Sequence, residues 1–509
     1  MEVRVRYAPS PTGLQHIGGV RTALFNYLFA RSMNGKFILR LEDTDRARSD
    51  ESFVQNLYDT FAWLGFRWDE GPDTGGPSAP YVQSERSALY GKYAEELLAR
   101  GEAYYCFCSA ERLENVRKER EEARAKGGGA SRESGYDRHC RGIPVEEGRR
   151  RAAAGESCTI RLKIPLGEDG GPGPATVFTD SLLGGIEWKN EDINPDPVLL
   201  KSDGFPTYHL ANVVDDHLMG ITHVLRAQEW LPSTPLHVIL YRAFGWEHPV
   251  FCHLPMVMGQ DGKKLSKRHG ATSVDEFRRQ GYLPEALINY VALLGASYEE
   301  GKDLYALEEL SRRFSLEKLN KAPAVFDYKK LEWYNGQYIR MKSDEELAGL
   351  TLPHAVSAGL FGTPGAGPDA CQRALYTAAM PLVRERLAFL HEAPEKLRYL
   401  FSEPEIPAAE EFFPKKADLG AAVKLLRLRR EITARLAAGN DEEAEALVKA
   451  KAGQEAVKLG DLMMPLRVAV TGARVSPPLF GSLRLLGAER SLARIDRALA
   501  KLEGRDGAC

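Results

Sequence analysis

The chain has 509 residues, of which 43% are hydrophobic and 27% charged. Both fractions are typical of globular proteins, so they exclude a collagen, a coiled-coil rod and a wholly disordered chain. With 68 basic and 71 acidic side chains the net charge is -3, which excludes a generally basic protein but leaves room for local basic patches that bind nucleic acid. No run approaches the roughly 18 apolar residues of a membrane span, and the charged start predicts no secretory segment. Seven cysteines in such a chain favour a reducing compartment, and we expect the cytoplasm.

The first hundred residues alternate strand and helix signals. Residues 3–7 predict a short strand, and the turn Pro9-Ser10-Pro11-Thr12-Gly13 follows it. Apolar residues recur at helical spacing over residues 20–33, and residues 37–41 predict a second strand. This order indicates a βαβ unit, and therefore a parallel sheet with right-handed crossovers.

From residue 106 to about residue 195 the character of the chain changes. The charged stretch 111–126 predicts a helix, the Gly-rich run 127–131 a loop, and residues 158–164 a strand. Charge runs are as typical of a solvated peripheral insertion as of a surface that contacts nucleic acid, so both interpretations stay open.

The α/β pattern then resumes. Residues 198–200 and 207–216 continue it, residues 223–227 predict a strand before a further helix, and a hairpin-like stretch follows at 254–258. Beyond about residue 275 the pattern is mainly helical. Glycine- and proline-rich breaks at 362–368 and 402–414 suggest two helical subdomains in this part.

Two short motifs suggest phosphate chemistry. The first, His16-Ile17-Gly18-Gly19, lies between a strand and a helix, where glycines admit a ligand and free backbone N–H groups face phosphate. The second, Lys264-Leu265-Ser266-Lys267-Arg268, lies in a glycine-flanked loop whose lysines could follow the charge of a leaving pyrophosphate. Taken singly, the first is equally a tight turn with a satisfied histidine, and the second a solvated surface loop.

Together the two motifs resemble the HIGH-type and KMSKS-type signatures of class I aminoacyl-tRNA synthetases. Gly19 stands where the second histidine would be, and Leu265 and Arg268 replace Met and the last Ser. The glutamyl/glutaminyl branch tolerates such variants. Three further stretches, residues 42–48, 208–217 and 225–230, make nearly the whole chain similar to bacterial-type glutamyl-tRNA synthetases.

The resemblance implies an α/β fold, with a Rossmann-type parallel-sheet catalytic domain, an inserted acceptor-end-binding domain and an all-α C-terminal anticodon-binding region. The implied boundaries are 1–105 and 196–258 for the catalytic domain, 106–195 for the insertion, 259–325 for a stem-contact region with the KLSKR loop, and 326–402 and 403–509 for two helical anticodon-binding subdomains.

The function that the resemblance implies is glutamate–tRNA ligation. ATP would activate L-glutamate, with Mg²⁺ accompanying the phosphates, and the glutamyl group would pass to the 3′ end of tRNA(Glu). Activation in this family usually requires tRNA, and we expect the same here, in a monomer with no membrane partner.

Glutamate recognition has a simple physical requirement, since two carboxylates and one ammonium group call for two cations and one anion. Arg6, Arg226 and Glu42 fall at predicted strand ends, where doubly wound sheets bind ligands. Tyr208 and Asn212 are spaced i,i+4 on one helix face. The alternative for both arginines is ordinary ion pairing with Glu2, Glu229 or another neighbour.

Arg226 carries the choice of amino acid, because glutaminyl enzymes of this branch have an uncharged residue at the matching place. A buried guanidinium would lack its counter-ion against a neutral amide, whereas a γ-carboxylate would supply it. Arg6 would then hold the α-carboxylate, although the two roles can be exchanged.

The implied site residues form three groups. The glutamate set is Arg6, Ser10, Glu42, Tyr208, Asn212 and Arg226. The ATP set is Ser10, His16, Gly18, Glu229, Trp230, Lys264 and Lys267, of which His16, Lys264 and Lys267 stabilise the developing charge. The anticodon set is Arg384 and Arg386, and the basic stretch Lys424, Arg427, Arg429 and Arg430 is more typical of solvated helix faces.

Two groups of residues are candidates for metal sites. For Asp215-Asp216-His217 we favour helix capping and internal hydrogen bonds over a metal. Some relatives bind structural zinc through a CxC pair and a downstream Tyr/Cys or Cys/His group, which implies Cys106, Cys108, Tyr136 and Cys140, with His139 as a substitute ligand. Gly142 stands where some relatives have a fourth ligand, and three reduced cysteines near a loop are the alternative.

Four other functions compete with this one. They are a relaxed enzyme that also charges tRNA(Gln), a short tRNA-modifying paralogue, a generic nucleotidylyltransferase and a non-catalytic RNA-binding relative. The long helical part argues against the second, the combined glutamate set against the third, and the intact His16 and Lys267 against the fourth.

Overall fold

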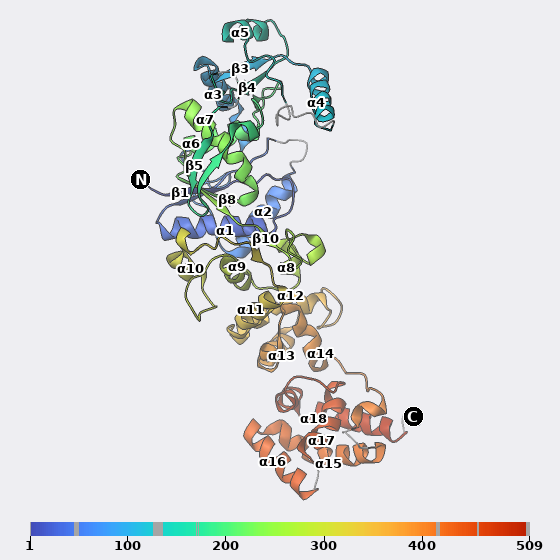
Figure 1. Cartoon of the computed structure of the whole chain (residues 1–509). Coiled ribbons are helices and arrows are strands. Elements are labelled where there is room, and N and C mark those ends of the chain that lie inside the picture. The colour runs from blue at the N-terminus through green and yellow to red at the C-terminus, as the bar shows by residue number, and fades with distance from the viewer. Residues whose placement is uncertain are drawn as a thin grey trace. The chain divides into compact units, whose positions relative to one another are not determined.

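The computed structural model describes residues 2–44, 50–125, 136–168, 171, 173–413, 418–455 and 458–504. The chain divides into two compact units, one of residues 1–277 and 287–327 and one of residues 278–286 and 328–509. Figure 1 shows the labelled strands within the first unit and only helices labelled from α11 onward. None of the helices in these ranges combines the length and apolar character that crossing a membrane requires.

The strands are β1 Arg4–Tyr7, β2 Lys36–Leu39, β3 Ala103–Cys106, β4 Thr159–Leu162, β5 Thr176–Asp180, β6 Gly184–Trp188, β7 Val198–Leu200, β8 His223–Ala227, β9 Val250–Leu254, β10 Val257–Met258 and β11 Ala324–Val325. The helices as far as residue 313 are α1 Ile17–Ser32, α2 Glu51–Leu64, α3 Ser87–Ala99, α4 Ala110–Ala125, α5 Val145–Ala153, α6 Tyr208–Leu218, α7 Thr234–Phe244, α8 Val274–Arg279, α9 Pro284–Leu293 and α10 Leu307–Arg313. The later helices are α11 Tyr328–Arg340, α12 Asp344–Ser357, α13 Ala370–Val383, α14 Ala393–Phe401, α15 Leu419–Ala438, α16 Asp441–Gln454, α17 Leu459–Thr471 and α18 Leu479–Leu502.

A parallel sheet forms the centre of the first unit. β1 pairs with β2, β8 with β9, and β9 with β5, all in parallel, and β6 adds an antiparallel edge. The Thr222 N–H donates to the Arg4 carbonyl at 2.9 Å, which places β8 beside β1. The predicted Rossmann-type core is therefore confirmed.

A second sheet, of antiparallel strands, has the order β3-β4-β7. Apolar side chains from these strands pack with those of α3, α6 and α7 in one buried cluster that includes Tyr90, Leu97, Leu162, Leu210 and Leu240. Burial of each large apolar side chain contributes roughly 1.5–3 kcal/mol, and together these side chains hold the inserted strands against the helices of the main sheet. α6 is thereby anchored firmly on one face, which matters because its other residues face the site.

The predicted strands at 3–7, 37–41 and 223–227 match β1, β2 and β8, and the helix expected at 111–126 matches α4. The loop expected at 127–131 lies outside the described residues. The hairpin expected at 254–258 was wrong, because β9 and β10 each pair in parallel with another strand. The chain reverses one step later, where Met258 bridges Lys264 in antiparallel register.

Candidate active site

The carboxyl ends of neighbouring parallel strands bring the first site residues together. β1 carries Arg6, β8 carries Arg226, and Arg40 and Glu42 directly follow β2. All four side chains are buried. Burial lowers the pKa of Arg226, and the positive charge of Arg6 lowers it further.

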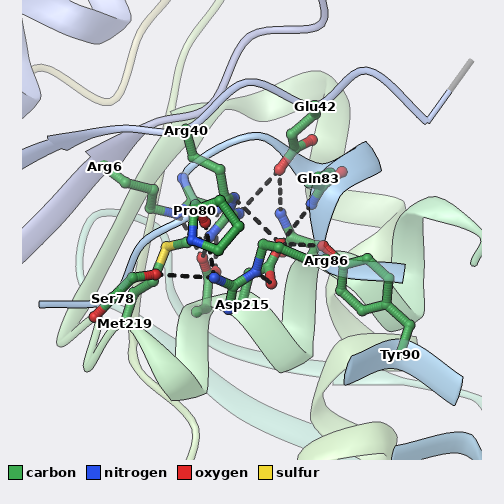
Figure 2. Close-up of polar contacts among 12 residues, drawn as sticks. Arg6, Arg40, Glu42, Ser78, Pro80, Gln83, Arg86, Tyr90, Asp215 and Met219 are labelled. Atoms are coloured by element: carbon green, nitrogen blue, oxygen red, sulfur yellow. Dashed lines mark hydrogen bonds and ion pairs between the residues drawn. The ribbon is translucent and has the colours of Figure 1, made fainter. Parts of the chain in front are cut away.

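Beneath this edge lies a buried network of three guanidinium groups and three carboxylates (Figure 2). Its charges balance, as buried ions require. Its members are Arg6, Arg40 and Arg86 on the basic side and Glu42, Asp215 and Asp216 on the acidic side.

Asp216 is the acceptor that joins two of these arginines. Its carboxylate accepts from Arg6 at 3.0 and 3.2 Å and from Arg40 at 2.7 Å. Burial alone would raise the pKa of Asp216, but the two cations outweigh it and the pKa is lowered. Arg6 is thus ion-paired with a neighbour, as the alternative interpretation had it, but with Asp216. Its Nη1 has no hydrogen-bond partner in the described part of the chain, and that atom is what Arg6 can offer a ligand.

Asp215 accepts three hydrogen bonds, from Arg86 at 2.7 Å, Gln83 at 2.8 Å and Tyr90 at 2.9 Å. These contacts confirm the internal hydrogen bonds expected for Asp215 and Asp216. The expected helix capping is wrong, because both residues lie inside α6, whose caps are Thr207 and Met219. Both carboxylates are occupied by cations, and among the described residues they join no group of metal ligands.

Glu42 is poised to receive a cation. Its Oε1 accepts from Arg40 at 2.9 Å and from Asn212 at 3.2 Å, while Oε2 has no partner in the described ranges. Burial raises the pKa of Glu42, although the charge of Arg40 opposes this. A ligand ammonium group at Oε2 would complete the hydrogen bonding of this carboxylate.

Arg226, in contrast, is surrounded by neutral groups. It donates from Nε to His253 at 3.1 Å, from Nη1 to the Tyr208 hydroxyl at 3.2 Å, and from Nη2 to Thr234 at 2.7 Å and the Trp230 carbonyl at 3.3 Å. Within the described residues no carboxylate oxygen lies within 4.0 Å of its nitrogens. This cation therefore has no counter-ion in direct contact among the described residues, and burial lowers its pKa.

Two further histidines flank the same guanidinium. His237 Nδ1 lies 3.4 Å from Arg226 Nη1, and His237 Nε2 lies 3.2 Å from His209 Nδ1. Burial and the charge of Arg226 lower the pKa of His209 to about 4 and that of His237 well below its usual range. Both are therefore neutral near pH 7 and add no competing charge.

The structure thus brings five of the six glutamate candidates together. Tyr208, at the start of α6, contacts Arg226, and Asn212 one turn later contacts Glu42, so the i,i+4 prediction for this helix face is confirmed. Ser10 differs, because it is exposed and its side chain makes no hydrogen bond within the described residues.

The ATP candidates gather around the start of α1. His16 accepts the Gly19 N–H at Nδ1 (3.2 Å) and caps the helix, which consequently begins three residues before the predicted position. A side chain on Gly18 would contact the His16 ring at 3.1 Å, and one on Gly19 would meet the Tyr7 hydroxyl at 2.7 Å. The space that a second histidine of the motif would need is therefore occupied by Tyr7.

The basic loop reaches the same region. Lys264 is ion-paired with Glu229. Desolvation lowers the pKa of His16, and the charge of Lys264 lowers it further. Trp230, 42% exposed, packs its ring 4.8 Å from that of Tyr208. Lys267 lies in the short 3₁₀ helix Lys267–His269, but its side chain lies outside the described residues.

The three cysteines form a cluster. The sulfurs of Cys106, Cys108 and Cys140 lie within 4.8 Å of one another, and among the described residues they are the one such group of potential metal ligands. The Tyr136 hydroxyl lies 3.3 Å from Cys106 and 3.8 Å from Cys108, whereas His139 is exposed. Tetrahedral zinc would separate sulfur and oxygen ligands by roughly 3.5–3.8 Å. The three thiols are therefore compatible with a zinc site, and the Tyr136 hydroxyl lies close to two of them.

In the second unit, the anticodon candidates already have partners. Arg384 is ion-paired with Asp344, and Arg386 donates to the Ser476 carbonyl. Along α15, Arg429 is fully buried, which corrects the expectation of a solvated face at that position. The other basic residues of that stretch, Lys424, Arg427 and Arg430, are exposed and ion-paired.

Sequence reasoning missed several residues that build the site, namely Arg40, Arg86, Asp180, Thr234, His237 and His253. Arg40 and His253 each interrupt an apolar run, Phe37-Ile38-Leu39 in one case and Val250-Phe251-Cys252 in the other. A charged or polar residue at a buried strand position needs a partner, and that signal could have identified both.

Comparison with known proteins gives this geometry its context. The family model for the catalytic domain of class I tRNA synthetases (E and Q) matches residues 2–333, and that for an anticodon binding domain matches residues 346–499.

Similar proteins extend over nearly the full chain. The glutamate–tRNA ligase of Treponema denticola is 57% identical over 98% of this chain and 100% of its own length, and that of Thermus thermophilus is 47% identical over 98% and 100%. A crystal structure of a glutamate tRNA ligase from Elizabethkingia meningosepticum in complex with its amino acid is 34% identical, with a TM-score of 0.84 over 99% of this chain and 100% of the other. The chain therefore belongs to the class I tRNA synthetases of the glutamate and glutamine branch and, within that branch, to the glutamate–tRNA ligases.

Proposed function

We propose that this chain activates L-glutamate with ATP and transfers the glutamyl group to the 3′ end of tRNA(Glu), and that activation requires bound tRNA. An oxygen of the α-carboxylate attacks the α-phosphorus, and pyrophosphate leaves. A hydroxyl of the terminal ribose of tRNA then attacks the acyl carbon, and AMP leaves. Both steps need positioned charges rather than a protein nucleophile.

The observation that carries the proposal is the uncompensated charge of Arg226. A γ-carboxylate supplies the missing counter-ion, whereas the amide of glutamine leaves a buried cation unpaired, which strongly disfavours binding. Arg6, through its free Nη1, suits the α-carboxylate, and Oε2 of Glu42 suits the ammonium group.

For the phosphates, His16 and Lys264 are the best-supported residues. His16 Nδ1 accepts the Gly19 N–H, so neutral His16 carries its proton on Nε2 and can donate it in a hydrogen bond to a phosphate oxygen. Lys264 must exchange Glu229 for the pyrophosphate, which an exposed ion pair permits at little cost. Lys267, Ser10 and Gly18 complete this proposed set, with Mg²⁺ bound mainly through the phosphates.

We assign tRNA contacts to the regions that the sequence suggested. Residues 106–195 would hold the acceptor end, with zinc at Cys106, Cys108, Tyr136 and Cys140 as a structural ion. Residues 259–325 would contact the stem, and the helical segments 326–402 and 403–509 the anticodon, with Arg384 or Arg386 exchanging its present partner for RNA.

Charging assays test the proposal directly. Purified tRNA(Glu) and tRNA(Gln) would each be incubated with labelled glutamate or labelled glutamine, ATP and the protein. We expect glutamyl-tRNA(Glu) and no glutaminyl product. Glutamate on tRNA(Gln) would show the relaxed enzyme instead, and no product from the folded chain would favour the non-catalytic RNA-binding relative.

A further inference from the structure

His253 occupies a position with a defined proton arrangement. It is the residue before the last of β9 and is fully buried. Its Nδ1 is 2.6 Å from Asp180 Oδ2, and its Nε2 is 3.1 Å from Arg226 Nε and 3.0 Å from Thr234 Oγ1. A guanidinium N–H can only donate, so Nε2 must accept, and the single proton of the neutral ring must lie on Nδ1, facing Asp180.

Asp180 is held firmly in this arrangement. Its Oδ1 accepts the N–H groups of Leu182 and Leu183 at 2.9 Å each, and its Oδ2 accepts the His253 N–H at 3.0 Å as well as the ring proton. The carboxylate orients the histidine as a carboxylate orients the imidazole of many active sites, by fixing both the tautomer and the ring plane.

His253 separates the negative charge of Asp180 from the guanidinium group of Arg226. His253 accepts from Nε of the guanidinium and Thr234 accepts from Nη2, while the Asp180 carboxylate bonds to His253 and to backbone N–H groups but not to Arg226. A carboxylate in direct contact would neutralise Arg226 and compete with a substrate carboxylate. A neutral imidazole orients the cation without neutralising it.

We propose that Asp180, His253 and Thr234 are positioning residues that hold Arg226 in its orientation and thereby set the preference for glutamate over glutamine. The inference rests on the proposed function, since these residues would orient the guanidinium group that binds the γ-carboxylate.

Three variants and one control test it in charging assays with tRNA(Glu). His253→Leu removes the acceptor for Nε, and Thr234→Val removes the nearer of the two acceptors for Nη2, leaving the Trp230 carbonyl. His253→Gln restores an acceptor near the position of Nε2. His223→Gln, at the opposite end of the strand that carries Arg226, is the control. KM is measured for glutamate and ATP separately, with kcat and thermal unfolding.

We expect KM for glutamate to rise about tenfold in His253→Leu and severalfold in Thr234→Val, while KM for ATP stays within about twofold. His253→Gln should recover most of the loss, and the ratio of kcat/KM for glutamate over glutamine should fall in the first two variants. The control should match the wild type.

A general loss of structure would raise the KM for glutamate and for ATP and lower the unfolding temperature. A misoriented Arg226 would raise the KM for glutamate alone, so the two effects are distinguished. If His253→Leu does not fold, Thr234→Val and His253→Gln decide the question. Two results would overturn the inference. One is an unchanged KM for glutamate in Thr234→Val. The other is a KM for glutamate in His253→Gln that is raised as much as expected for loss of the acceptor, about tenfold. Failure of the wild-type chain to charge glutamate would instead overturn the proposed function.

Discussion

Arg226 shows how a binding group is kept at the expense of stability. It is 5% exposed and has no counter-ion among the described residues. A buried ion without a partner opposes folding, and apolar replacements at such positions are often neutral or stabilising. The fold therefore retains an unfavourable charge at the place where a substrate carboxylate would compensate it.

Arg226→Met tests this trade-off. We expect kcat/KM for glutamate to fall about 100-fold or more, because charge-assisted hydrogen bonds to a carboxylate contribute roughly 1.5–3 kcal/mol each. The thermal unfolding temperature should stay equal or rise. The exposed Arg242→Met on α7 serves as the control and should change neither quantity. A large loss of stability in Arg226→Met would show that the arginine is structural.

His209 provides a pH dependence with a definite sign. Its folded-state pKa of about 4 lies below the unfolded value near 6.5, so the unfolded chain binds the proton first as the pH falls. The contribution is fully present above about pH 6.5 and is lost between pH 6.5 and pH 4. Between pH 7 and pH 5 this amounts to about 2 kcal/mol.

Denaturant unfolding at pH 7 and pH 5 measures the effect. The wild type should lose about 2 kcal/mol more than His209→Gln between the two values, because the variant lacks the titrating group. Equal losses in both proteins would mean that His209 is not buried in its neutral form.

At the scale of single elements, the first turn of α1 depends on close contact with β1. Gly19 has no room for a side chain, since a Cβ would lie 2.7 Å from the Tyr7 hydroxyl but 3.8 Å from the ring carbon that bears it. Removing that hydroxyl would therefore make the space that Gly19→Ala needs.

A double-mutant cycle checks this account. Gly19→Ala should destabilise the wild type by about 1–3 kcal/mol through overpacking, and by much less in a Tyr7→Phe background. The coupling is measured from urea unfolding of the four proteins. Additive effects would show that the helix start is limited by something other than Tyr7.

The cysteine cluster joins β3 to the segment after α4, and the proposed zinc makes it testable. Protein purified without chelators should contain about one zinc ion per chain. Cys108→Ala should lower the content, and chelation should speed amide hydrogen exchange in β3 and around Cys140. Cys371→Ala, at an exposed cysteine, is the control. Zinc retained fully in Cys108→Ala would exclude this ligand set.

Element types were predictable where local pattern and tertiary contacts agree. β1, β2 and β8 follow from short apolar runs beside turns. Arg6 and Arg226 were suggested mainly by the family resemblance, and their places at strand ends agree with the rule that ligands bind there. Local pattern fails where distant residues decide. The start of α1 depends on a cap from His16, and the hairpin expected at 254–258 was displaced because β9 and β10 find parallel partners elsewhere.

The buried partners were the least predictable part of the site. Asp216 lies 210 residues from Arg6 in sequence, and His253 lies 73 residues from Asp180. No local spacing encodes such pairs. The His253–Asp180 pair follows from the sheet order that places β9 beside β5, and the Arg6–Asp216 pair from the packing of α6 near the end of β1. The sequence pattern alone determines neither arrangement.

At the scale of the whole molecule, net charge does not explain affinity for a polyanion, since the chain carries -3. Binding of tRNA must therefore use local basic groups, and affinity should fall with salt according to the number of phosphates contacted. Each of the two compact units carries a segment that matches a different family model, one catalytic and one anticodon-binding.

ATP–pyrophosphate exchange, with glutamate or glutamine and each with and without tRNA, tests the central claim most directly. We predict exchange only when glutamate and tRNA are both present, because in the proposed function Arg226 selects the carboxylate and activation requires bound tRNA. Exchange with glutamine at a comparable rate would contradict the assignment of Arg226 as the selecting residue. Exchange with glutamate in the absence of tRNA would contradict the coupling.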